Sequence, residues 1–125
     1  MKKASSFRES FGYACRGLLH CLRHERNFRV HLVMGCAAFL LGAVLGLSGT
    51  ELAVLSLLVA FVLFAEMINT ALENLVDLFT REYHPLAAVV KDVAAGAVLI
   101  VCVIAVVIGV LLFAPHLAEL LQINL

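Results

Sequence analysis

The sequence predicts an all-α membrane protein with three transmembrane helices and an N-terminal amphipathic helix on the membrane surface. Hydrophobic residues make up 63% of the 125 positions, and only 14% of the residues are charged. A soluble domain of this length buries too small a fraction of its surface to hide so many apolar side chains. Lipid must therefore cover the rest. No internal repeat or low-complexity segment is evident, so we expect one domain over residues 1–125.

The N-terminal segment, residues 1–29, is expected to form the surface helix. Apolar residues recur in it at three- and four-residue steps, as on one face of a helix: Phe7, Phe11, Ala14, Leu18, Leu19 and Leu22. Much of the remaining circumference is polar and basic: Arg8, Arg16, His20 and Arg23. This pattern is typical of a helix on the inner leaflet. Periodicity alone favours a plain anchor over a segment with a chemical role.

Three apolar stretches predict the membrane helices, which we place at residues 30–47, 52–79 and 91–113. The third contains the charge-free run Val93–Phe113, and Pro115 just beyond it predicts the end of the helix. Between the first two, Ser48 and Glu51 have the spacing of a capping box. The sequence therefore predicts a tight hairpin of two membrane helices followed by a third span.

The basic residues predict the orientation of the chain. Seven of the nine lie before the first span: Lys2, Lys3, Arg8, Arg16, Arg23, Arg26 and Arg29. The other two, Arg81 and Lys91, lie between the second and third spans. By the positive-inside rule, the N-terminus is cytoplasmic and the C-terminus lies outside. We expect a multi-pass protein of the inner (plasma) membrane.

Polar side chains form a stripe along the second span. The stripe consists of Glu66, Asn69, Glu73 and Asp77, at offsets that share one side of a helix. An ionisable residue costs about 2.5–3.5 kcal/mol at the centre of a membrane helix, and such residues usually mark a function. The stripe therefore predicts a site where water meets the acyl chains. The alternative is that Glu66 and Glu73 simply reach water while Asn69 joins helices.

Depth along the helix suggests a role for each carboxylate. Glu66 and Glu73 are separated by about 10 Å along the axis at 1.5 Å per residue. The deeper Glu66 lies nearer the level of a lipid hydroxyl, where desolvation suits it to act as a general base. The shallower Glu73, with Glu25 as second ligand, suits Mg²⁺ beside nucleotide phosphates.

The sequence lacks the motifs of two common classes of ATP-binding protein. It contains no GxxxxGK[ST] motif and no glycine loop or catalytic loop of the protein-kinase type. Phosphate binding would then rely on Lys91, on arginine or on Mg²⁺. The four cysteines, Cys15, Cys21, Cys36 and Cys102, have neither CxxC nor zinc spacing, and we expect them to be structural and unpaired.

The polar residues together resemble the signature of the small prokaryotic diacylglycerol kinase family. The segment from Glu66 to Asp77 carries the strongest match, and the resemblance continues at Glu82-Tyr83-His84, Lys91-Asp92, Gly12-Tyr13, Arg16-Gly17-Leu18 and Glu25–Arg29. It covers nearly the entire chain. Residues 27–31 and 84–96 look like the undecaprenol kinase branch, because the position of His31 is typically acidic in the diacylglycerol kinase branch. Ser6 and Glu9 depart from the family pattern, which often has basic residues there that contact substrate.

This resemblance implies a homotrimer with active sites shared between subunits. It implies that Glu66 is the catalytic proton acceptor, and that Glu25 and Glu73 hold Mg²⁺ against the phosphates of ATP. Further nucleotide contacts are implied for Tyr13, Glu82, Tyr83, His84, Lys91 and Asp92. Asn69 and Arg29 are expected to contact the substrate or support the site.

The leading hypothesis is phosphorylation of undecaprenol by ATP. The first alternative is the same reaction on diacylglycerol, which would make phosphatidate. A second alternative is a small ion channel or transporter, but a conducting path would need polar groups beyond Leu63, and none is evident. A purely structural scaffold would bind no nucleotide.

Overall fold

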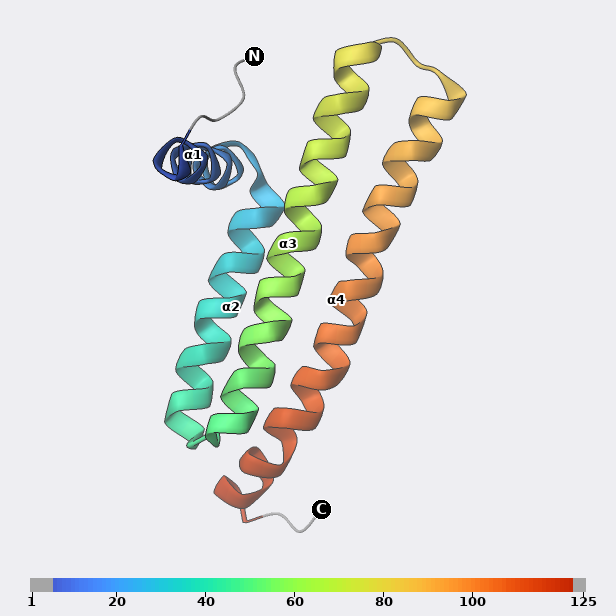
Figure 1. Ribbon diagram of the computed structural model, residues 1–125. Helices are drawn as coiled ribbons and strands as arrows, with labels where there is room; N and C mark the ends of the chain where they lie inside the picture. The colour runs from blue at the N-terminus through green and yellow to red at the C-terminus, as the bar shows by residue number, and fades with distance from the viewer. Residues whose placement is uncertain (1–5, 123–125) are drawn as a thin grey trace.

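The computed structural model describes residues 6–122, which form four α-helices (Figure 1). They are α1 (Phe7–His24), α2 (Arg26–Leu45), α3 (Gly49–Phe79) and α4 (Pro85–Leu120). Helices α2, α3 and α4 are each long and apolar enough to cross a membrane. The expected all-α architecture is therefore confirmed, with three helices that could span a membrane. Lys2 and Lys3, which entered the orientation argument, lie outside the described residues.

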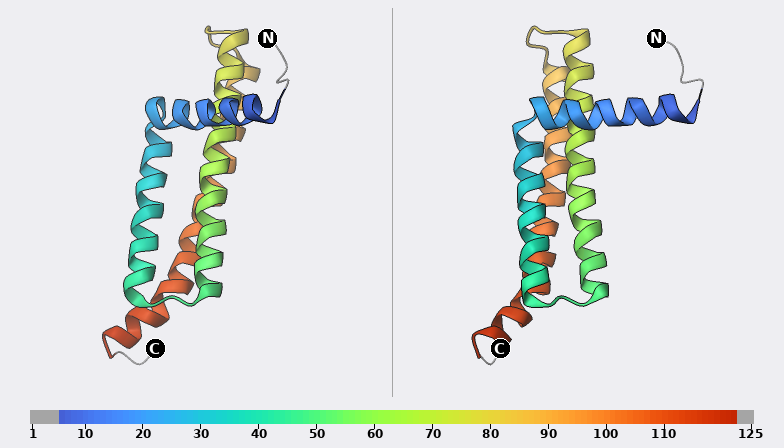
Figure 2. Two further views of the ribbon diagram at one scale, coloured as in Figure 1. Left: turned by 60° about the vertical axis from the view of Figure 1, so that its left-hand side comes forward. Right: turned by 90° about the vertical axis from the view of Figure 1, so that its left-hand side faces the viewer.

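The three long helices run side by side, and α1 crosses them at a steep angle (Figures 1 and 2). Helix α3 is the middle of this arrangement, because it packs against both α2 and α4, which contact each other much less. Both α3 and α4 continue past the level of α1, so their connecting loop lies beyond it (Figure 2). The polar stripe on α3 consequently runs from the level of α1 toward this loop.

The first helix is shorter than the predicted surface segment. Ser6 caps its N-terminus by accepting a hydrogen bond at 3.3 Å from the backbone N–H of Glu9. The helix ends at His24, because Glu25 has an extended backbone conformation. Residues 26–29 therefore belong to α2, and the prediction of one surface segment over residues 1–29 is wrong at its end.

The hairpin between α2 and α3 confirms the predicted capping box. Oγ of Ser48 accepts a bond from the backbone N–H of Glu51 at 3.3 Å, and Oε2 of Glu51 accepts one from the backbone N–H of Ser48 at 2.7 Å. Helix α2 ends before its predicted limit at residue 47, because Gly46 adopts the left-handed conformation with φ 73°. Helix α3 starts at Gly49, earlier than the predicted residue 52, because the cap fixes its first turn.

Helix α4 is longer at both ends than the predicted span 91–113. His84 caps its start, where Nδ1 accepts a hydrogen bond from the backbone N–H of Leu86 at 3.2 Å. The prediction that Pro115 ends the helix is wrong, since the helix continues to Leu120 with a bend near its C-terminal end (Figure 1). A proline inside a helix removes one backbone hydrogen bond, and its ring clashes with the carbonyl group one turn earlier, so it kinks or breaks the helix. Here it kinks α4 without ending it. The segment beyond it is held by the contact of His116 Nε2 with Oε1 of Glu51, at 3.0 Å.

The interior of the single chain is small. The buried side chains of α3 lie on one face of that helix: Leu55, Val62, Glu66, Asn69 and Thr70. Helices α2 and α3 approach closely at Gly35, where an added Cβ atom would lie 2.7 Å from Cγ1 of Val59. Only 11–17% of the most apolar part of each span is buried within the chain. Most of the apolar surface is therefore free to contact lipid or another protein.

Candidate functional site

The carboxylate of Glu66 is one of the most deeply buried polar groups in the described chain, with 2% of the residue exposed. It lies on the face of α3 that packs against the junction of α1 and α2. Asn27 lies beside the carboxylate, and His31 is close enough to influence it electrostatically. A buried carboxylate needs such partners, because an isolated charge is costly in an apolar interior. Glu66 was predicted from the sequence as a site residue, whereas Asn27 was not.

Two further carboxylates converge on this position. Glu25, in the break between α1 and α2, and Glu73, two turns along α3, both lie within electrostatic range of Glu66. Glu73 is fixed by Asn69, whose Nδ2 donates a hydrogen bond to Oε1 at 3.0 Å. The structure therefore brings together four of the predicted site residues: Glu25, Glu66, Asn69 and Glu73.

These carboxylates fit a magnesium ion that is held only in part by protein. Among residues 6–122 no group of three or more His, Cys, Asp or Glu side chains is close enough to enclose a metal. Mg²⁺ is usually bound by one or two carboxylates, with phosphates and water as its remaining ligands. Glu25 and Glu73 match that smaller donor set.

Two buried oxygen atoms of α3 have no partner within the described chain. They are Oδ1 of Asn69 and the hydroxyl Oγ1 of Thr70. Leaving a buried polar atom unsatisfied costs about 1–3 kcal/mol. Both residues are more than nine-tenths buried.

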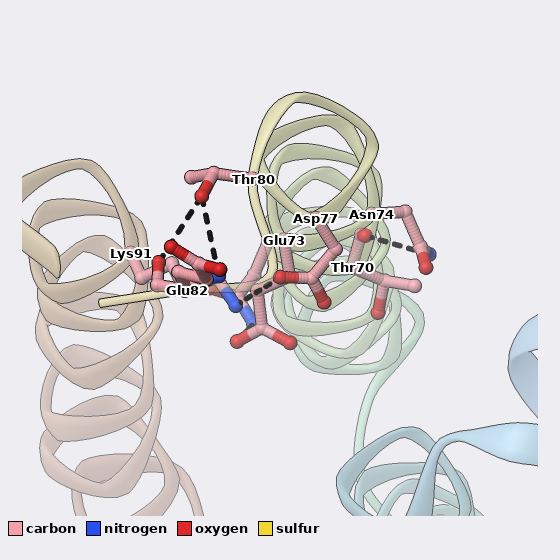
Figure 3. A network of polar contacts seen from close by, with 8 residues as sticks. Thr70, Glu73, Asn74, Asp77, Thr80, Glu82 and Lys91 are labelled. Carbon is pink, nitrogen blue, oxygen red and sulfur yellow. Dashed lines mark hydrogen bonds and ion pairs between the residues drawn. The ribbon is translucent and has the colours of Figure 1, made fainter. Parts of the chain in front are cut away.

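A second polar site lies at the loop between α3 and α4. A pocket of about 230 Å³ there is lined by four of the predicted nucleotide contacts: Glu82, Tyr83, His84 and Lys91. Nζ of Lys91 lies 2.5 Å from Oδ1 of Asp77, and Thr80 bonds the backbone of Glu82 (Figure 3). The pocket thus combines two cationic side chains, Arg81 and Lys91, with two carboxylates, Asp77 and Glu82, and with aromatic and hydroxyl groups in a partly open setting. Such a mixed polar lining can contact a soluble, charged ligand such as a nucleotide.

Arg81 also lines this loop pocket and was not among the predicted nucleotide contacts. A signal for it was present in the sequence, because Arg81 and Lys91 are the two basic residues beyond residue 30. Asp77 was recognised as part of the stripe, but its pairing with Lys91 depends on how α3 and α4 pack.

The two polar sites are connected by one face of α3. Asp77 lies about 16 Å beyond Glu66 along the axis, at 1.5 Å per residue. Glu73 lies between them, and the side chains of Glu73 and Asp77 extend toward α4, whereas Thr70 and Asn74 lie on the other flank (Figure 3). The stripe therefore leads from a buried carboxylate to an open, cationic pocket.

Three predicted site residues lie outside both polar sites. Tyr13 on α1 contacts Arg16, whose guanidinium carbon is 4.6 Å from the ring centroid. Asp92 is exposed and does not line the loop pocket. Arg29 donates hydrogen bonds to carbonyl oxygens at the C-terminal end of α1, those of Leu22 and Arg23 at 3.3 and 3.0 Å. Arg29 therefore supports the junction of α1 and α2 next to Glu25.

The four cysteines are all free thiols, as expected. Burial, followed by the nearby Glu25 carboxylate, raises the pKa of the Cys21 thiol, so it remains neutral where α1 packs on the bundle. Sγ of Cys102 lies 3.9 Å from Nε2 of His31, and both residues line an apolar cavity between α2, α3 and α4. Cys21 and Cys102 are therefore packed between helices, whereas Cys15 and Cys36 are exposed.

Comparison with known proteins gives consistent matches over most of the chain. The model of the family described as prokaryotic diacylglycerol kinase matches residues 12–113. The chain is 43% identical over 111 residues to the undecaprenol kinase of Bacillus subtilis (strain 168), covering 89% of this chain and 90% of that protein. It is 42% identical over 113 residues to a diacylglycerol kinase of Synechocystis, covering 90% of this chain but 65% of the relative. The diacylglycerol kinase of Escherichia coli (strain K12) is 31% identical over 105 residues, covering 84% of this chain and 86% of that protein.

Proposed function

Because the chain belongs to the prokaryotic diacylglycerol kinase family and is a lipid kinase, we propose that it transfers the γ-phosphoryl group of ATP to undecaprenol. The observation that carries this proposal is the buried Glu66 on a membrane helix, joined by a polar stripe to the open loop pocket. Such an arrangement allows an alcohol dissolved in the membrane to meet a nucleotide dissolved in water. Similarity to an undecaprenol kinase over most of both chains favours this acceptor.

We place the loop pocket in the cytoplasm and α1 on the inner surface of the plasma membrane. Basic residues support this orientation, because those after residue 30, Arg81 and Lys91, both line the loop pocket. Helix α1 exposes large apolar side chains, including Phe7, Phe11 and Leu18, which would enter the lipid headgroup region. ATP would then reach the pocket directly from the cytoplasm.

The proposed reaction uses Glu66 as the proton acceptor. The lipid hydroxyl oxygen forms a bond to the γ-phosphorus while the bond from that phosphorus to the β–γ bridging oxygen breaks, which releases ADP. The hydroxyl proton passes to the Glu66 carboxylate. Asn27 and His31 of α2 lie within range to interact with that carboxylate. Because the protein does little covalent chemistry in phosphoryl transfer, positioning and charge stabilisation carry most of the rate.

Glu25 and Glu73 are proposed to hold Mg²⁺, with Asn69 fixing the orientation of Glu73. The ion would neutralise charge on the phosphate oxygens when ATP is bound. Lys91 and Arg81 supply positive charge from the protein at the loop pocket, where Glu82, Tyr83 and His84 are proposed to contact the nucleotide. Tyr13 and Asp92 remain proposed nucleotide contacts that would require ATP to extend beyond this pocket.

We propose that the active unit is a homotrimer whose sites include residues from neighbouring subunits. The unpartnered oxygens of Asn69 and Thr70 support a partner outside the single chain. The extensive exposed apolar surface of α2, α3 and α4 supports packing of further copies as well as lipid. In an assembly of this kind, α1 of one copy could bring Tyr13 to the site of another.

A two-lipid kinase assay tests this function. The purified protein in nanodiscs receives labelled ATP with either undecaprenol or diacylglycerol at equal mole fraction, and initial rates are compared. Faster phosphorylation of undecaprenol is the expected result. Diacylglycerol is the alternative acceptor, because several relatives are named diacylglycerol kinase. A faster rate with diacylglycerol would make it the acceptor in place of undecaprenol.

A further inference from the structure

An apolar groove runs through the membrane-spanning part of the fold between α2, α3 and α4. It has a volume of about 260 Å³ and extends from His31 at one end to Phe113 at the other. Along α4 its lining reaches from Cys102 to Phe113, which is about 16 Å at 1.5 Å per residue. None of the described residues that line it is Asp, Glu, Lys or Arg. The groove therefore suits a hydrocarbon chain.

One end of this groove adjoins the proposed catalytic carboxylate. His31 lines the groove and is also close enough to Glu66 to influence it electrostatically. Cys102 faces the same end, with Sγ 3.9 Å from Nε2 of His31. The groove therefore begins close to Glu66, where the chain of a lipid bound by its hydroxyl would start.

Small residues give the groove its width. Ala38 on α2 and Ala105 and Gly109 on α4 line it, and a Cβ atom added at Gly109 would meet nothing within 4 Å. A polyprenyl chain is broader than a saturated acyl chain, because each isoprene unit carries a methyl branch. Small lining residues leave room for such branches, whereas a close-packed groove would admit only a narrow chain.

We infer that this groove binds the isoprene units next to the hydroxyl of a polyprenyl alcohol, and that Ala38 and Gly109 set its preference for a branched chain. The inference rests on the proposed function and specifies how the acceptor is selected. The remainder of the long polyprenyl chain would lie in the surrounding lipid.

Two native cysteines provide a test that does not depend on activity. Cys102 lines the groove, whereas Cys36 is exposed on α2 and does not line it. The wild-type protein in nanodiscs is treated with a membrane-permeable maleimide, with and without undecaprenol, and labelling at each cysteine is followed by mass spectrometry. We expect undecaprenol to slow Cys102 labelling severalfold and to leave Cys36 labelling unchanged. Equal effects on both cysteines, or none on Cys102, would overturn the inference, as would stronger protection of Cys102 by diacylglycerol.

A matched pair of substitutions tests whether the groove is used by the acceptor lipid. Ala38→Leu fills the groove, whereas Ala37→Leu adds the same volume at the neighbouring exposed position. We expect Ala38→Leu to lower kcat/KM for undecaprenol by about tenfold, as overpacking predicts, with KM for ATP unchanged. Equal kcat/KM values for the two variants would count against the groove. The wild-type protein could phosphorylate undecaprenol while this lipid does not change Cys102 labelling and Ala38→Leu does not change kcat/KM. That result would contradict lipid binding in the groove but would leave the proposed function intact. If the wild-type protein does not phosphorylate undecaprenol, the proposed function itself is contradicted.

Discussion

Nζ of Lys91 on α4 lies 2.5 Å from Oδ1 of Asp77 on α3, and this ion pair joins the two helices at the mouth of the loop pocket. The two side chains are 38% and 53% exposed. Exposed ion pairs are worth only about 0–1 kcal/mol to folding. The main consequence of the pair is therefore the position of the Lys91 ammonium group, which is held in the loop pocket proposed to bind the nucleotide.

Substituting each partner of this pair in turn separates the effect of the Lys91 charge from the effect of its pairing with Asp77. Asp77→Asn is expected to change the free energy of unfolding by less than about 1 kcal/mol. Lys91→Met is expected to raise KM for ATP by roughly 10- to 100-fold, because a hydrogen bond to a charged group contributes about 1.5–3 kcal/mol. Steady-state rates at varied ATP measure this, with Glu119→Gln at the opposite end of the protein as the control. An unchanged KM in Lys91→Met would remove Lys91 from the nucleotide site.

Asn69 and Glu73 provide a test of the proposed metal site. Asn69→Ala removes the 3.0 Å hydrogen bond that fixes Oε1 of Glu73. Because a ligand that is less well oriented binds its metal more weakly, by about 10- to 100-fold on loss of such an outer partner, more Mg²⁺ should be needed for half-maximal activity. The measurement is a Mg²⁺ titration of the rate at saturating ATP. Asn74→Ala, on the other flank of α3, should leave the Mg²⁺ concentration for half-maximal activity unchanged. An equal shift of that concentration in both variants would indicate a general effect on the helix.

The junction of α1 and α2 depends on Arg29. Arg29→Gln removes the charge that supports bonds to the carbonyl oxygens of Leu22 and Arg23, so we expect a loss of about 1–2 kcal/mol in stability. Thermal unfolding in detergent gives the stability, and limited proteolysis after α1 reports local loosening. Arg26→Gln is the matched control, since Arg26 is an exposed residue of the same short segment. Equal stability of the two variants would show that Arg29 does not hold α1.

The turn at the far end of the bundle should affect stability without affecting chemistry. Glu51→Ala removes both the capping box with Ser48 and the 3.0 Å contact with His116. Loss of a helix cap costs about 0.5–2 kcal/mol. We expect a lower unfolding temperature with KM for ATP unchanged, while Thr50→Ala leaves both quantities close to those of the wild type. A large change in KM for ATP would mean that the two ends of the bundle are coupled.

Sequence patterns predicted those features that depend on local chemistry. The three spans follow from uninterrupted apolar runs, and the Ser48–Glu51 turn follows from the spacing of a capping box. The stripe from Glu66 to Asp77 could be predicted because helical periodicity alone places these residues on one side. Pro115 shows the limit of local rules. The helix continues beyond this proline with a kink, and there His116 contacts Glu51, which is distant in sequence, so no local pattern shows the contact.

Features that depend on the angle between helices could not be predicted from the sequence. The role of Arg29 requires that α1 turn sharply at Glu25, so that its last carbonyl groups face the start of α2. The proximity of Asn27 and His31 to Glu66 likewise depends on how this junction packs against α3. Arg81 carries a charge that the sequence shows, but only the conformation of the loop places it in a pocket with Lys91.

The most direct test of the proposed mechanism is the rate of phosphoryl transfer from labelled ATP to undecaprenol by Glu66→Gln, measured beside ATP binding and oligomer size. Glutamine keeps the shape of the side chain but cannot accept the hydroxyl proton. The expected result is a rate lowered by about 10²–10⁴-fold, the usual contribution of a general base, with ATP affinity and oligomer size close to those of the wild type. A variant that transfers phosphate at nearly the wild-type rate would contradict the assignment of Glu66.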